Sequence, residues 1–139
     1  MRTLFLLAMS LLCSVAAAAP VPKELKKQEK LVGLWKVESV KIGGMDSNVG
    51  ANDTDWSIDE TFTLIRSGTL KAAIPTIELK VNTATKELDW PSGGQLYLGR
   101  YEISGDRLTI CLSMQNFPRP AKLEPNAQNY VWALRRTQK

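Results

Sequence analysis

Apolar and polar residues alternate with a period of two along most of the chain that follows Gly33. Successive side chains of a strand point to opposite faces, so this alternation predicts half-buried β-strands. The alternating runs are short, they are separated by turn-forming residues, and no helical pattern lies between them. We therefore predict an all-β fold, a small antiparallel barrel of about seven or eight strands, because closure removes exposed strand edges.

The clearest predicted pairing surrounds Gly105-Asp106, a dipeptide that favours a two-residue hairpin turn. With that turn, Tyr101 faces Ile110 within an apolar row, and Arg100 faces Cys111 on the opposite, more polar side. Because this register sorts apolar from polar residues, we predict a hairpin over Gln95 to Met114.

Six further strands are predicted where the alternation is strongest, and long loops are predicted over Gly43 to Asp55 and Gln115 to Asn129. A change of apolar parity near Glu38-Ser39 predicts a β-bulge in the first of these strands. In the second, Glu60 shares the parity of an inward apolar row, where a carboxylate needs a partner. It either anchors a ligand, pairs with an arginine or lies exposed at the barrel mouth. The six strands are Trp35 to Ile42, Trp56 to Ile65, Leu70 to Ile74, Ile77 to Val81, Glu87 to Trp90 and Tyr130 to Arg136.

The first residues of the chain are typical of a secretory signal peptide. Arg2 is followed by the apolar run Leu4 to Leu12 and by four alanines, and we place the cleavage after Ala18. The alternative of an uncleaved anchor requires a longer apolar run. We thus divide the chain into a signal peptide (1–18), an N-terminal segment with a short helix over Pro22 to Val32 (19–32) and a barrel domain (33–137), and we predict a secreted or periplasmic protein.

The composition excludes several kinds of chemistry. The 139 residues carry a formal net charge of +4 and include no histidine, which excludes Ser-His and Cys-His nucleophile pairs and most zinc sites. The Asp-rich and Asn-rich stretch from Asp46 to Asp55 has no glutamate to close a calcium loop. The basic residues form no stripe that would suit nucleic acid. We predict no metal, no cofactor and no nucleic-acid partner.

Several motifs together carry a resemblance to a known family. Gly33-Leu34-Trp35 resembles the Gly-x-Trp with which lipocalin-like barrels begin, and it is followed by the block Gly99 to Leu112 and by Arg119-Pro120. In order and spacing, residues 28–136 are similar to a family of small exported lipocalin-like domains that is abundant in planctomycetes. The family has no established activity, so the resemblance implies a fold. The run Ala121 to Leu123 departs from the family pattern.

The resemblance also implies a structural role for Trp35, whose ring closes one end of such barrels beneath a basic residue, here Arg135 or Arg136. Two other residues leave alternatives open. Arg119 either pins its loop to backbone carbonyls or binds an anion, and Cys111 is either a semi-buried structural thiol or a thiol activated by Arg100. The residues to which we assign structural roles are Gly33, Trp35, Gly105, Asp106, Cys111, Arg119, Pro120 and Arg136.

The functional prediction is a non-catalytic binding protein. It binds either a small apolar molecule inside the barrel or an envelope protein through its loops; small barrels are often filled by their own side chains, which favours the second mode. The alternative is an enzyme with Glu60 or Cys111 at the barrel mouth. The predicted ligand-binding residues are Glu60, Phe62, Tyr97, Tyr101 and Trp132.

Overall fold

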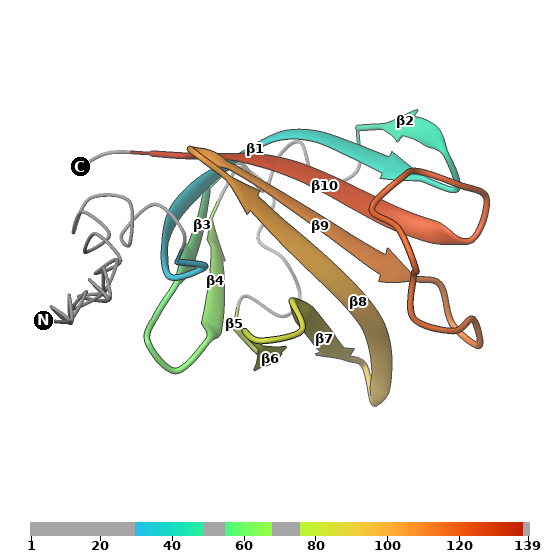
Figure 1. Ribbon diagram of the computed structural model, residues 1–139, viewed down its shortest axis with the longest axis horizontal. Helices are drawn as coiled ribbons and strands as arrows, with labels where there is room; N and C mark the ends of the chain where they lie inside the picture. Colours follow the sequence, from blue (N-terminus) through green and yellow to red (C-terminus); the bar gives the residue numbers. More distant parts are fainter. Residues whose placement is uncertain (1–29, 49–54, 68–75, 138–139) are drawn as a thin grey trace, which may run out of the picture.

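The computed structural model of the chain describes residues 30–48, 55–67 and 76–137. Within these ranges every residue in regular structure belongs to one antiparallel sheet, which curves around on itself (Figure 1). The prediction of an all-β, antiparallel fold is therefore confirmed. The strands are β1 (Gly33–Ile42), β2 (Met45–Ser47), β3 (Asp55–Ile58), β4 (Thr63–Ser67), β5 (Thr76–Glu78), β6 (Lys80–Asn82), β7 (Glu87–Ser92), β8 (Gln95–Ser104), β9 (Arg107–Ser113) and β10 (Asn129–Arg136).

The sheet nearly closes into a barrel through one short segment of the chain. The strand order is β5-β4-β3-β1-β10-β9-β8-β7-β6, with β2 paired to β1 outside this path. The two ends of that order, β5 and β6, are separated in sequence only by Leu79, which is buried. Its amide donates a hydrogen bond of 3.0 Å to the carbonyl of Phe62. A single extended segment thus pairs with β4 through its first half and with β7 through its second half.

The predicted hairpin and bulge are confirmed. In the β8–β9 ladder Tyr101 lies opposite Ile110 and Arg100 opposite Cys111, in the register that the Gly105-Asp106 turn predicts. Gly105 has φ 60°, as a two-residue turn of this kind requires at its first position. The pairing of β1 with β10 shifts register between Val37 and Ser39, where the apolar parity changes.

The predicted strand over Trp56 to Ile65 is wrong, because a tight turn divides it into β3 and β4. The Asp59 carboxylate accepts hydrogen bonds from the Thr61 amide (2.8 Å), the Thr61 hydroxyl (2.7 Å) and the Thr63 amide (3.0 Å). These bonds, the Thr61 hydroxyl first, hold the pKa of Asp59 below its ordinary value. Local side-chain bonds of this type stabilise a turn over an extended strand.

The predicted loop over Gly43 to Asp55 contains one further strand. Gly43 and Gly44 have φ values of 58° and 79°, which suits a tight hairpin turn, and β2 folds back on the end of β1. An ion pair of 3.1 Å between Lys41 Nζ and Asp46 Oδ1 joins the two strands.

Other predictions fall on residues outside the described ranges. These are the signal peptide, most of the Pro22 to Val32 helix and the strand over Leu70 to Ile74; the last three residues of the predicted helix, 30–32, are described and are not helical. No helix in the described part of the chain is long and apolar enough to cross a bilayer.

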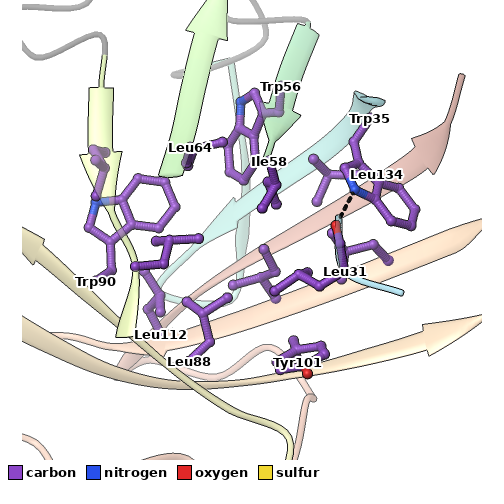
Figure 2. Packing of buried hydrophobic residues seen from close by; sticks show 14 of the residues in the cluster. Leu31, Trp35, Trp56, Ile58, Leu64, Leu88, Trp90, Tyr101, Leu112 and Leu134 are labelled. Atoms are coloured by element: carbon purple, nitrogen blue, oxygen red, sulfur yellow. Dashed lines mark hydrogen bonds between the residues drawn. The ribbon is translucent and has the colours of Figure 1, made fainter. Parts of the chain in front are cut away.

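Tryptophan side chains fill the interior of the barrel (Figure 2). The ring centroids of Trp56 and Trp90 lie 5.5 Å apart, and the ring of Trp132 lies 5.6 Å from that of Trp90 and 6.1 Å from that of Trp56. The three residues come from β3, β7 and β10, and no two of these strands are neighbours in the sheet. The centre of the barrel is therefore occupied by the protein's own side chains.

One end of the barrel is closed around Trp35, which has no exposed surface. Its indole Nε1 donates a hydrogen bond of 2.9 Å to the carbonyl of Leu31, which Figure 2 shows as a dashed line. The Arg136 guanidinium lies 4.0 Å from the ring centroid and donates a hydrogen bond of 3.1 Å to the Val32 carbonyl. Arg136, and not Arg135, thus covers Trp35; Arg135 pairs instead with Glu38 at 2.7 Å.

Candidate ligand-binding pocket

A pocket of about 360 Å³ opens beside the segment 30–32. Three parts of the chain surround it: this segment, the turn between β3 and β4, and the turn between β6 and β7, while Tyr101 reaches it from β8. Its apolar lining consists of Leu31, Val32, Phe62 and Tyr101, and its polar lining of Lys30, Glu60, Thr83 and Lys86. It lies on the outer side of the barrel end that Leu31, Trp35 and Arg136 close, and we call this space the mouth pocket.

Phe62 is placed in the mouth pocket by an uncommon backbone conformation. Its φ is 59°, which a bulky side chain rarely adopts and which costs about 1–3 kcal/mol. The Phe62 amide donates a 3.0 Å hydrogen bond to the carbonyl of Asp59, and its carbonyl accepts the Leu79 amide. The hairpin and the β5–β6 segment together therefore hold Phe62 in this conformation, with its ring packed against the core.

Lys86 also lines the mouth pocket, and like Phe62 it has a positive φ, of 58°. The turn before it is organised by Asn82, whose Oδ1 accepts hydrogen bonds from the amides of Ala84 (3.1 Å) and Thr85 (3.2 Å). Lys86 Nζ lies 5.6 Å from the ring centroid of Tyr101, within the range of a cation–π contact. The ammonium group therefore lies above an aromatic side chain at the rim of the pocket.

Tyr101 provides the buried aromatic surface of the mouth pocket. It is only 2% exposed, and this burial raises the pKa of its phenol above the ordinary 10.0. The hydroxyl is therefore uncharged at neutral pH and is able to donate a hydrogen bond.

Glu60 lies exposed on the β3–β4 turn, which agrees with the alternative that it is solvent-exposed, although the continuous strand predicted around it is wrong. Its place in the mouth pocket is at the rim. A carboxylate in that position needs no buried partner, since water solvates it.

The structure separates the five predicted ligand-binding residues into two groups. Glu60, Phe62 and Tyr101 line the mouth pocket. Tyr97 and Trp132 belong instead to an aromatic cluster inside the barrel, where the ring of Tyr130 lies 6.2 Å from that of Tyr97 and 5.9 Å from that of Trp132. The cluster packs on itself, and neither residue lines the mouth pocket.

Sequence reasoning missed the contributions of the segment 30–32 and of the β6–β7 turn. The segment was assigned to a helix, and nothing in its alternating charges indicates that Leu31 accepts the Trp35 hydrogen bond. For Lys86 a signal did exist, since Asn82 begins a predicted turn and the residue that ends such a turn often has positive φ. A turn residue between two strands of one barrel lies at a barrel end.

Cys111 lies away from the mouth pocket. Its side chain is fully buried, and burial raises the pKa of the thiol to about 11. A thiol with this pKa is almost entirely protonated at neutral pH and is a weak nucleophile. The facing residue Arg100 does not reverse this effect.

Arg119 joins the loop between β9 and β10 to the barrel wall. Its Nη1 donates hydrogen bonds to the Asp89 carboxylate (2.5 Å) and to the Gly99 carbonyl (2.6 Å), and its Nε lies 3.6 Å from Glu87 Oε1. The neighbouring Pro118 carbonyl accepts a hydrogen bond from the Ser113 hydroxyl. We call residues 114–128, held by these bonds, the strap.

In the described ranges, no three metal-binding side chains of the His, Cys, Asp or Glu type lie close enough together to hold an ion. Comparison of the chain with models of protein families, with curated proteins and with solved structures finds no match.

Proposed function

We propose that this chain is an exported, non-catalytic, lipocalin-like binding protein and that the mouth pocket is its ligand-binding site. The observation that carries the proposal is the convergence of Leu31, Phe62 and Tyr101 on one space of about 360 Å³ with a polar rim. Small-molecule sites are commonly apolar pockets of about 300–1,000 Å³ with a few polar groups that orient the ligand.

The lining of the mouth pocket indicates the kind of ligand. The apolar surface suits a hydrocarbon or ring, and Lys30 and Lys86 at the rim suit a carboxylate or another anionic head group. Because Trp56, Trp90 and Trp132 fill the centre of the barrel, the ligand lies at the mouth. We thus propose a small amphiphilic anion, such as a fatty acid.

The two residues of the enzymatic alternative support binding over catalysis. Cys111 has a raised thiol pKa and does not line the mouth pocket, and Glu60 lies exposed at its rim. Neither is paired with a base or an acid in the pocket, which nucleophilic or general acid–base chemistry requires.

Titration with the fluorescent fatty acid dansyl-undecanoic acid tests this proposal. We expect saturable binding of about one molecule per chain, displaced by dodecanoate, and a Phe62→Ala variant that binds at least about fivefold more weakly because it loses buried apolar contact. Phe117→Ala is the matched control, since Phe117 is 40% exposed and lies on the strap. Absence of saturable binding, or equal loss in both variants, would contradict the proposal.

A further inference from the structure

A second pocket, of about 680 Å³, lies between the barrel wall and the strap. Arg100, Glu102 and Thr109 line it from β8 and β9. These residues alternate with the inward-facing Tyr101 and Ile110, so they belong to the outer face of the sheet. Residues 121–124 of the strap form the opposite wall. We call this space the strap pocket.

The strap pocket contains a charged group with no acceptor. Arg100 is only partly exposed, its Nε is buried without a hydrogen-bond partner, and no ion pair to Arg100 occurs among the described residues. By contrast, Arg119 of the strap, which does not line this pocket, has two carboxylates and one carbonyl around it. Among the described residues the Arg100 guanidinium therefore has no carboxylate partner, and a bound oxyanion would supply charge-assisted hydrogen bonds to it.

The strap holds its wall of the pocket in place from both sides. Arg119 fixes the strap before residues 121–124. After them, Asn129, itself 2% exposed, donates a hydrogen bond of 2.9 Å to the Glu124 carbonyl and accepts one of 3.0 Å from the Asn126 amide. The pocket is therefore preorganised, which lowers the entropic cost of binding a ligand.

The remaining polar residues of the strap pocket define the rest of its chemistry. Lys86 and Lys122 add two ammonium groups to the Arg100 guanidinium. Thr85 and Thr109 supply hydroxyl groups, and Glu102 and Glu124 supply exposed carboxylates. The positive groups suit an oxyanion, while the carboxylates suit hydroxyl or ammonium groups elsewhere on the same molecule.

We propose that the strap pocket is a second binding site and that it takes the carboxylate or phosphate group of a small polar molecule. The Arg100 guanidinium receives the oxyanion, and Lys122 approaches it from the strap. The proposal does not depend on the mouth pocket, which shares only Lys86 and Tyr101 with this one.

Nitrogen-15 NMR of the full-length mature chain tests the proposal through the Arg100 Nε–H signal. The probes are inorganic phosphate, phenyl phosphate and benzoate. A shift with the two phosphates and not with benzoate indicates a phosphate site, and the reverse indicates a carboxylate site. We expect a saturable shift of the Arg100 signal with at least one class of probe. Arg100→Gln should weaken binding by at least about tenfold, since hydrogen bonds to charged groups contribute about 1.5–3 kcal/mol. Arg107→Gln, an exposed arginine outside the pocket, is the matched control.

Two further variants make the result decisive. Lys122→Gln lies on the exposed strap, so it tests the site even if Arg100→Gln disturbs the fold, and it should weaken binding about threefold. Phe62→Ala should leave oxyanion binding unchanged, which separates this site from the mouth pocket. The proposal fails if no probe shifts the Arg100 signal, or if Lys122→Gln and Arg107→Gln bind equally well.

Discussion

At the scale of single residues, Gly33 shows how one missing side chain permits the closed end of the barrel. Its φ is 145°, and a Cβ atom built there would lie 2.5 Å from Nη1 of Arg136. That guanidinium covers Trp35 and bonds the Val32 carbonyl. The Gly-x-Trp spacing in the sequence predicts a strand start, but the need for glycine becomes clear only when the Arg136 side chain, from the residue opposite Trp35, is seen to lie against Gly33.

Gly33→Ala should therefore destabilise the protein by about 1–3 kcal/mol, through backbone strain and displacement of Arg136. The measurement is urea denaturation followed by tryptophan fluorescence. Gly93→Ala is a matched control, because Gly93 also has positive φ, 58°, but no atom lies within 4 Å of its built Cβ. Equal losses in the two variants would mean that contact with Arg136 contributes nothing.

At the scale of structural elements, the sequence predicts hairpins well where a turn and an alternating register agree. The Gly105-Asp106 hairpin is such a case. The β3–β4 turn is the opposite case, since Ile58, Phe62 and Leu64 keep the same parity through a turn that Asp59 organises. A turn that preserves this parity cannot be detected from parity alone, so the sequence predicts Glu60 within a continuous strand. The mouth pocket forms only where the segment 30–32, the β3–β4 turn and the β6–β7 turn meet in space. The sequence does not reveal that meeting, so it predicts only some of the lining residues.

The strap is the element whose attachment is most open to test. The hydrogen bond to Asp89 raises the pKa of Arg119 above the already high ordinary value of an arginine, so the ion pair persists at any ordinary pH. Arg119→Gln should lower the free energy of unfolding by about 1–3 kcal/mol, because it leaves the partly buried Asp89 carboxylate without its donor. Arg107→Gln, on the exposed end of β9, should change it by less than about 0.5 kcal/mol in the same urea titration. If both variants match the wild type, the Arg119 bonds do not hold the strap.

At the scale of the whole molecule, we expect the protein to become less stable at alkaline pH because of the buried thiol of Cys111. Burial raises its pKa to about 11 in the folded chain, whereas an exposed thiol has a value of 9.0. Between these values the unfolded chain loses a proton that the folded chain keeps, so the free energy of unfolding falls as pH rises from about 9 to about 11. Below pH 9 this contribution is fully present.

The expected slope from this one group approaches about 1.4 kcal/mol per pH unit at its steepest. Urea titrations of the wild type at about pH 8.5 and about pH 10 measure this fall in the free energy of unfolding. The same two titrations of Cys111→Ala should show a smaller fall, whatever the absolute stability of the variant. If the free energy of unfolding of Cys111→Ala falls as much as that of the wild type between these pH values, Cys111 is not the cause of the pH dependence.

The pairing of the first long strand with the last has a consequence for how the protein is made. Trp35 lies opposite Arg136 and Ile42 opposite Tyr130, so β1 pairs along most of its length with β10, the last of the described strands in sequence order. A growing polypeptide cannot complete this ladder until β10 has been synthesised. Until then β1 lacks this neighbour, so the contacts between the two strands form only after β10 has been translated.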